Sequence, residues 1–185
     1  ISGINKTILP DDDANSGNSE TNTLTMTIEG NDFKHLKDIA KREGVTSNVV
    51  WLAIYSLLLS KYSNDSKISF GTITANRNEQ HAESLVGMFV NTMLVSFEVK
   101  KHETFDSFIG KLMMEFTLYL DNQDFPLEEI ATMIPGRRTK SKNVLFDTLF
   151  IYENLRGGTV SVEDINQKSA TNTQSEFLLT FSCHE

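Results

Sequence analysis

Two short polar segments in this sequence hold the residue types best suited to contact a ligand. Leu85–Thr92 reads LVGMFVNT, and Asn122–Glu128 reads NQDFPLE. The amide of Asn91 offers both a hydrogen-bond donor and an acceptor, and Gly87 lets the backbone come close to a ligand or to a neighbouring helix. A plainer interpretation is that Gly87 makes a turn and Asn91 caps a backbone group nearby. The sequence therefore predicts either a wall of a binding site or a local turn here.

Nucleophilic and metal-binding chemistry finds little support in the sequence. The chain has one cysteine and four histidines, with no adjacent histidine pair and no metal-ligand spacing. Cys183 and His184 are neighbours, but successive residues of a strand point to opposite faces, which argues against a nucleophile and its base. His81 falls in a polar loop before Gly87, and we interpret it as a surface residue. We therefore predict no catalytic residue and no metal site in this chain.

The spacing of apolar residues predicts the elements that must position the two segments. Asp124 is expected to cap a short helix that has Pro126 in its first turn. The predicted elements are, in order, a strand at 24–28, a helix from Asn31 or Asp32 to near Gly44, an apolar helix from Thr46 or Ser47 to about Tyr62, strands at 68–74 and 93–99, a helix capped by Thr104 and reaching Leu120, the short helix ending before Pro135, a strand at 144–152 and a last strand at 177–181.

Long helices that alternate with strands predict an α/β fold, with helices packed on one side of a mixed sheet in two layers. Residues 1–23 are expected to be a linker that is largely disordered, because residues 11–23 hold a single apolar residue and no aromatic. Residues 24–185 form the predicted folded unit. We expect this unit to be truncated at its carboxyl end, because no closing element follows the last strand.

Five segments together resemble the later motifs of the condensation domains of nonribosomal peptide synthetases. The segments at 85–92 and 122–128 are similar to the family patterns I/V-G-x-F-V-N-T and N-Q-D-x-P-F-E. The other three matches are Gly71–Arg77 with G-T-x-x-A-N-R, Arg138–Leu145 with R-D-x-S-R-N-P-L, and Phe177–Thr180 with F-D-L-T. Their order is that of the second half of such a domain, so the resemblance implies a carboxyl-terminal lobe like one lobe of chloramphenicol acetyltransferase.

The resemblance also implies a function. Condensation domains join an upstream aminoacyl or peptidyl thioester to the amine of a downstream aminoacyl thioester, and both substrates hang on phosphopantetheine arms of peptidyl carrier domains. The arms enter a tunnel between the amino-terminal and carboxyl-terminal lobes. The family's His-His-x-x-x-Asp-Gly motif is missing here, so we expect this fragment to form a tunnel wall, to bind no cofactor directly and to be inert alone.

Individual site residues follow from the same resemblance. The candidates for the tunnel wall and substrate binding are Gly87, Phe89, Asn91 and Thr92. The candidates for a supporting or structural role are Arg77, Gln123, Asp124 and Arg138. Arg77 follows the end of a predicted strand and is expected to form a structural ion pair.

Several residues depart from the family pattern and leave alternatives open. Ser96 and Thr139 stand where the family has Arg and Asp, Lys142 and Val144 replace Arg and Pro, and Leu127 replaces Phe. One alternative is a docking or binding lobe, without catalysis, of an inactive condensation-like parent. Another is a CoA-dependent acyltransferase of the chloramphenicol acetyltransferase type, which builds its sites across the subunits of a trimer.

Composition narrows the class of partner. The net charge of −8 argues against nucleic acid and against an anionic membrane surface. The longest apolar run, Val49–Leu59, is too short to cross a bilayer, which takes about 20 residues. A single cysteine excludes an internal disulfide and suits a reducing cytoplasm.

Overall fold

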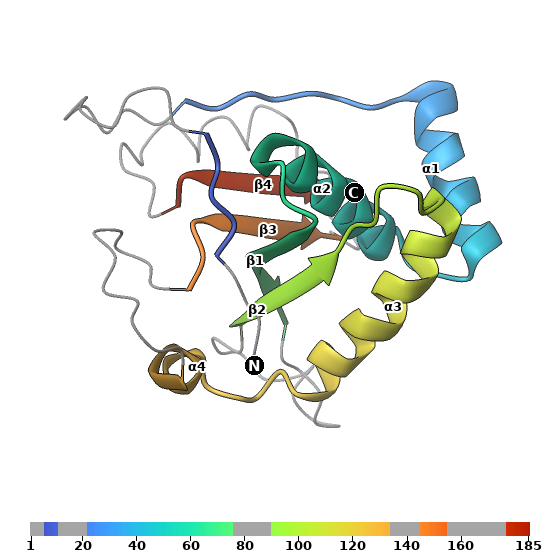
Figure 1. Cartoon of the computed structure of the whole chain (residues 1–185). Helices are drawn as coiled ribbons and strands as arrows, with labels where there is room; N and C mark the ends of the chain where they lie inside the picture. Colours follow the sequence, from blue (N-terminus) through green and yellow to red (C-terminus); the bar gives the residue numbers. More distant parts are fainter. Residues whose placement is uncertain (1–5, 11–21, 76–89, 134–144, 155–176) are drawn as a thin grey trace, which may run out of the picture.

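A mixed β-sheet lies at the centre of the chain (Figure 1). The structure is a computed structural model, and it describes residues 6–10, 22–75, 90–133, 145–154 and 177–185. The elements in these ranges are α1 (Gly30–Glu43), α2 (Ser47–Ser63), β1 (Lys67–Thr74), β2 (Asn91–Glu98), α3 (Phe105–Asp121), α4 (Leu127–Met133), β3 (Thr148–Glu153) and β4 (Leu179–His184).

The strand order in the described sheet is β2-β1-β3-β4. β1 and β2 are antiparallel over their whole length, from Lys67 opposite Glu98 to Thr74 opposite Asn91. β1 pairs with β3 in parallel, and β3 pairs with β4 in parallel. Among the described strands, β2 and β4 are thus the edges of the sheet, and the mixed sheet predicted from the sequence is confirmed.

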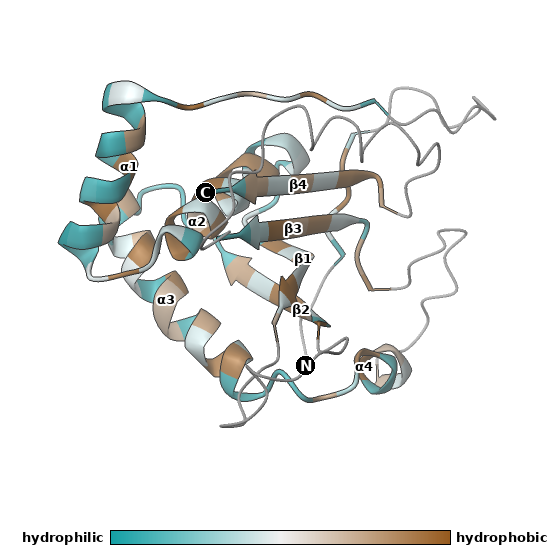
Figure 2. Ribbon diagram, turned by 180° about the vertical axis from the view of Figure 1, so that it is seen from behind, coloured by the Kyte–Doolittle hydropathy of each residue, from teal (hydrophilic) through white to brown (hydrophobic). Residues whose placement is uncertain are grey.

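α2 and α3 cover one face of the sheet and build the main core, and α1 packs against both of these helices. α2 is apolar on almost all sides, as its sequence predicted, and it packs against both the sheet and α3 (Figure 2). α1 is mostly hydrophilic, and Ala40 is its only buried residue. The fully buried side chains of this core include Leu52, Tyr55, Leu59, Ile68, Phe70, Val95, Phe97, Ile109, Leu112 and Phe150.

A smaller core lies on the opposite face, where α4 packs near β2. Leu94, Leu145, Phe146 and Leu149 form its buried centre, and Leu127 and Ile130 of α4 pack against them. No residue of α4 is fully buried. The sequence predicted the short helix, but not that it covers the second face of the sheet.

Capping explains most of the helix boundaries. Thr104 caps α3 as predicted, and its hydroxyl accepts a hydrogen bond from the Ser107 amide at 3.3 Å. α1 ends at Gly44 as predicted, because glycine adopts the left-handed conformation there without strain, at a φ of 65°. Its start differs from the prediction, since Glu29 rather than Asn31 or Asp32 occupies the N-cap position.

The strand predicted at 24–28 is wrong. Residues 22–29 run without regular secondary structure, and the side chains of Leu24 and Met26 are 97% and 77% exposed. Alternation of apolar and polar residues is compatible with a strand, but a strand also needs a neighbouring strand with which its main chain forms hydrogen bonds. No such neighbour pairs with it in the described part of the chain.

Residues 6–10 belong to the packed structure, which corrects the predicted linker at that point. The hydroxyl of Thr7 accepts a hydrogen bond from the buried amide of Ser69 at 2.7 Å, and Lys6 pairs with Asp147 at 2.6 Å. Leu9 packs against the main core. These contacts lie beyond the short stretch in which β1 and β3 pair directly, so the segment fills a gap that the two strands leave open.

Candidate functional site

A cavity of about 740 Å³ follows the outer edge of β2 between α3 and α4. We call it the β2 groove. Its walls are mostly apolar and include Leu118, Phe125 and Ile130, while Thr92 and Leu94 form part of its floor. Its volume lies within the range of small-molecule sites. Leu118 and Phe125 are 65% and 42% exposed, so the groove opens to solvent in this chain.

The free edge of β2 presents main-chain groups to the groove. In an antiparallel pair, alternate residues turn their amide and carbonyl groups away from the partner strand. Ser96 is one of these residues, because Tyr119 on α3 bonds to both of its main-chain groups. By the same alternation, Thr92 and Leu94 also face outward, toward the groove.

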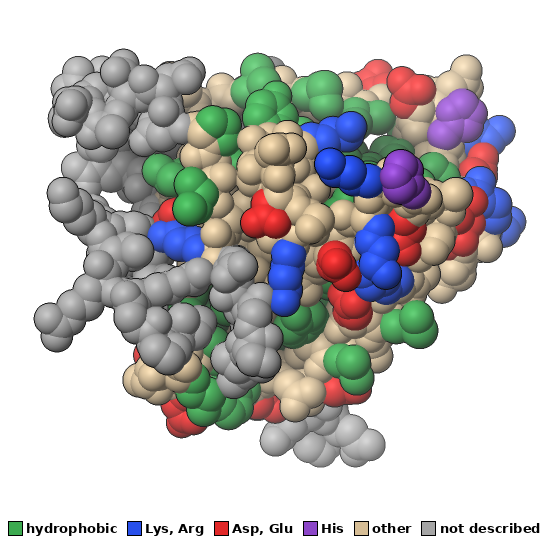
Figure 3. All heavy atoms as spheres, in the orientation of Figure 1, with side chains coloured by type: hydrophobic (Ala, Val, Ile, Leu, Met, Phe, Trp, Pro, Cys, Tyr) green, Lys and Arg blue, Asp and Glu red, His purple; other side chains and the backbone are tan. Residues whose placement is uncertain are grey.

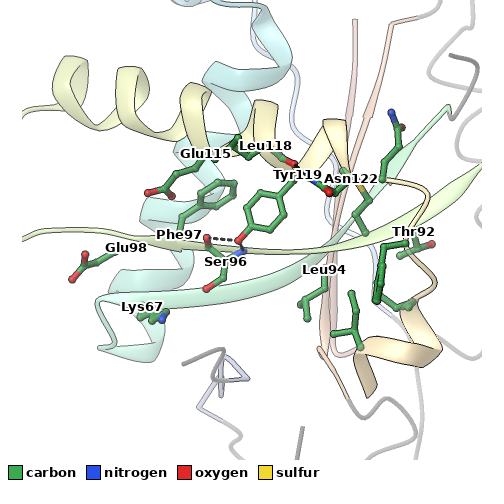
Figure 4. A pocket seen from close by; sticks show the side chains of 15 residues that line it. Lys67, Thr92, Leu94, Ser96, Phe97, Glu98, Glu115, Leu118, Tyr119 and Asn122 are labelled. Atoms are coloured by element: carbon green, nitrogen blue, oxygen red, sulfur yellow. Dashed lines mark hydrogen bonds between the residues drawn. The ribbon is translucent and has the colours of Figure 1, made fainter. Parts of the chain in front are cut away.

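Tyr119 closes the β2 edge at Ser96 (Figure 4). Its hydroxyl accepts from the Ser96 amide and donates to the Ser96 carbonyl, both at 3.1 Å. Burial raises the pKa of the Tyr119 phenol, although the bond to Ser96 opposes this shift, so the hydroxyl keeps its proton at neutral pH. Tyr119 was not predicted from the sequence, although a tyrosine beside an otherwise apolar helix stripe is a signal for such a residue.

Tyr55 in the main core provides a contrast with Tyr119. Its buried hydroxyl lies near that of Thr148, but neither group forms a hydrogen bond of good geometry among the described residues. Burial raises the pKa of Tyr55, with the nearby Thr148 hydroxyl opposing. The Tyr119 hydroxyl therefore both donates and accepts a hydrogen bond, whereas the Tyr55 hydroxyl does neither among the described residues.

Replacing the two tyrosines by phenylalanine should affect the free energy of unfolding differently. Tyr55→Phe should leave the free energy of unfolding unchanged or raise it by about 1 kcal/mol, because it removes an unsatisfied polar group. Tyr119→Phe should lower it by about 1–2 kcal/mol, because two main-chain groups of Ser96 lose their partner. Urea denaturation of both variants checks this, and equal losses would contradict the assignment of the two hydroxyls.

Asn91 joins the two polar segments that the sequence singled out. Its side-chain amide donates to the carbonyl of Gln123, 32 positions away in the sequence, at 2.5 Å. Gln123 is only 7% exposed. Asn91 therefore caps a backbone group, as the plainer interpretation held, but the group is distant in sequence, and the bond fixes the turn after α3 against the start of β2.

The remaining predicted site residues divide into three groups. Thr92 lines the groove, and its predicted part in substrate binding stays a prediction. Asp124 is exposed and is not the cap of α4; the carbonyl of Pro126 accepts from Glu129 and Ile130 instead, which makes Pro126 the capping residue. Gly87, Phe89, Arg77 and Arg138 lie outside the described residues.

Charged residues gather at one end of the groove. Lys111 donates to the carbonyl of Glu98 at 3.1 Å and lies 3.8 Å and 4.0 Å from the carboxylates of Glu98 and Glu115. Burial raises the pKa of Glu115, and Lys111 opposes the shift. Elsewhere, Lys and Arg are intermixed with Asp and Glu over α1 and α3 (Figure 3), so the described surface of these two helices has no patch of one sign.

A second polar cluster lies at the end of β3 and β4. His184 contacts the Ser182 hydroxyl at 2.9 Å and the Glu153 carboxylate at 3.2 Å. All three side chains are open to solvent, and the β2 groove does not include them. Cys183 lies on the other face of the strand, as predicted, and burial together with Glu185 raises the pKa of its thiol to about 11. The thiol is therefore a poor nucleophile at neutral pH.

Within the described ranges, no group of three or more His, Cys, Asp or Glu side chains is placed to hold a metal ion. Among the helices of these ranges, none is long and apolar enough to cross a bilayer.

The comparison with protein families decides the identity of this fold. The family model for the condensation domain matches residues 2–185. The chain belongs to the condensation domain family. Bacitracin synthase 1 of Bacillus licheniformis is 37% identical to it over 136 residues, which is 74% of this chain and 3% of that protein. Tyrocidine synthase 3 of Brevibacillus parabrevis is 36% identical over 154 residues, which is 82% of this chain and 2% of that protein.

Solved structures show the same fold. The condensation domain from Monacolin K polyketide synthase MokA matches with a TM-score of 0.63 at 18% identity, and the match covers 80% of this chain and 36% of that one. The predicted α/β fold, a mixed sheet with helices as in an acetyltransferase-like lobe, is thereby confirmed. The chain spans only a few per cent of the length of the two synthases named above.

Proposed function

We propose that this condensation-domain chain is the carboxyl-terminal lobe of a domain that makes amide bonds in nonribosomal peptide synthesis. The main support is the β2 groove, because Thr92 from one motif segment lines it and the hydrogen bond from Asn91 to Gln123 ties both segments to its wall. In this proposal the groove is one side of the passage in which two carrier-bound thioesters meet.

The proposal gives the named residues different roles. Asn91 and Gln123 set the position of the groove wall, and Thr92 contacts the substrate arm. Gly87 and Phe89 are proposed as further residues for substrate binding, Arg77 is proposed to form a structural ion pair, and Arg138 and Asp124 are proposed as supporting residues. Among the described histidines, none lines the groove; in this proposal the base comes from another lobe, and the present lobe positions the substrates.

Partners and location complete the proposal. The lobe would close on the amino-terminal lobe of its own domain and receive the phosphopantetheine arms of an upstream and a downstream peptidyl carrier domain. It would bind no cofactor of its own and work in the cytoplasm. Its contribution to the rate would be positional, since holding two reactants in line removes much of the entropic barrier to their reaction.

Amide formation between two loaded carrier domains tests the proposed function. We expect no product from this chain alone, and product from the complete domain with its amino-terminal lobe. Within that domain, Leu118→Glu should lower the rate by about tenfold or more, because it places a charge on the apolar groove wall. Leu118 is exposed, so the fold should tolerate the change.

Met114 provides the matched control. It lies one turn earlier on α3, is 67% exposed and does not line the groove. Met114→Glu should therefore leave the rate unchanged. Product from the isolated chain, or equal rates in the two variants, would contradict the proposal, and carrier binding without any product from the complete domain would favour a docking lobe instead.

A further inference from the structure

The main-chain edge of β2 is closed at one end and open at the other. Tyr119 forms hydrogen bonds with both outward main-chain groups of Ser96, and Lys111 donates to the main-chain carbonyl of Glu98. The outward groups of Thr92 and Leu94 have no hydrogen-bond partner among the described residues. An unpaired strand edge is a template for an added chain that can pair with it.

We propose that the main chain of Thr92 and Leu94 pairs with the two amides of a pantetheine arm, in the way that an added strand pairs with a sheet edge. This inference rests on the proposed function, because it assumes that the groove receives the arm of a carrier domain. It assigns recognition to the backbone of β2, whereas the sequence had suggested the side-chain amide of Asn91, which is already bound to Gln123.

The character of the groove agrees with this ligand. Pantetheine is uncharged along its length and carries two secondary amides joined by two methylene groups, so it offers donors and acceptors at intervals along an extended chain. The floor of the groove offers the complementary groups, while Leu118, Phe125 and Ile130 provide apolar walls for the methylene groups. A charged ligand would suit this end of the groove less well, because the charged residues lie at the Glu98 end.

Tyr119 sets the end of the pairing site. Its two bonds to Ser96 leave no outward main-chain group free at that residue. An arm that follows the edge can therefore pair at Thr92 and Leu94 but cannot continue past Leu94. Tyr119→Phe should lengthen the pairing site by one outward residue.

A titration of the isotope-labelled 185-residue chain with reduced pantetheine, followed by nuclear magnetic resonance, tests the proposal. The amide signals of Thr92 and Leu94 should shift strongly, while those of Met93 and Val95, which face β1, should shift little. In Tyr119→Phe the Ser96 amide should join the responding set. Pantetheine methylated on both amide nitrogens should bind about tenfold more weakly, because it has lost the amide donors that would pair with the strand carbonyls.

Substitutions at Thr92 separate the backbone from the side chain. Proline is tolerated on an edge strand where the missing amide faces outward, so Thr92→Pro should weaken binding about three- to tenfold. Thr92→Val keeps the amide, so its loss of affinity should be smaller than that of Thr92→Pro.

The possible results distinguish this inference from the proposed function. Main-chain pairing would be overturned if Leu118 and Phe125 shifted without the alternating pattern on β2. It would also be overturned if the methylated ligand bound as tightly as pantetheine. In either case the groove would remain the site of the arm. Absence of any response in the groove at saturating pantetheine would overturn both.

Discussion

Alanine in place of Phe150 should lower the free energy of unfolding by about 3–5 kcal/mol. Phe150 is 1% exposed on the central strand β3. Its ring stacks on Phe181 of β4 at 5.9 Å between centroids and lies 5.5 Å from the ring of Tyr55 on α2. The substitution would therefore leave a cavity where the sheet meets the helix layer, with rigid aromatic neighbours that cannot collapse into it.

Tyr62→Ala is the control for this first prediction. It removes an aromatic ring that is 65% exposed near the end of α2, so the free energy of unfolding should change by no more than about 0.5 kcal/mol. Guanidinium denaturation of the two variants gives the comparison. A loss below about 1 kcal/mol for Phe150→Ala would mean that this core is not packed as described.

The second large effect is expected at Gly71. Replacing it by alanine should lower the free energy of unfolding by about 2–3 kcal/mol, because the added methyl group overpacks the core. A Cβ atom at Gly71 would lie 2.3 Å from Cε2 and 2.6 Å from Cζ of the Phe146 ring. Phe146 is 4% exposed and stacks on Phe177 at 5.6 Å, so it has little room to move away. The Phe146 ring thus approaches β1 so closely that position 71 requires glycine.

Gly110 offers a control of opposite sign. It lies inside α3, and a Cβ atom there would meet nothing within 4 Å, so Gly110→Ala should raise the free energy of unfolding by about 0.5–1 kcal/mol. Phe146→Leu should partly rescue Gly71→Ala in a double-mutant cycle. If Gly71→Ala proved as stable as the parent chain, the stacked position of Phe146 would be incorrect.

The sequence predicted the elements well where local chemistry decides them. Thr104 and Gly44 mark helix boundaries through their own side-chain or backbone preferences, and both are confirmed. The strand expected to begin at Val144 instead begins at Thr148, because Leu145 and Phe146 pack into the smaller core before the chain reaches the sheet. Apolar character indicates burial, but it does not tell which core a residue joins.

The site was harder to predict than the fold. Thr92 and Asn91 were named from their motif, and Thr92 does line the groove. The bond from Asn91 to Gln123 and the closure of Ser96 by Tyr119 join residues 32 and 23 positions apart. Such pairs depend on how α3 crosses β2, and a single sequence carries no direct signal for that geometry.

The position of Thr7 bears on where this polypeptide can be cut or fused. A recombinant version that starts at Leu24, as composition alone would suggest, would deprive the Ser69 amide of its acceptor and Asp147 of its Lys6 partner. The natural boundary for expression therefore lies ahead of Lys6, and tags are best attached before that residue.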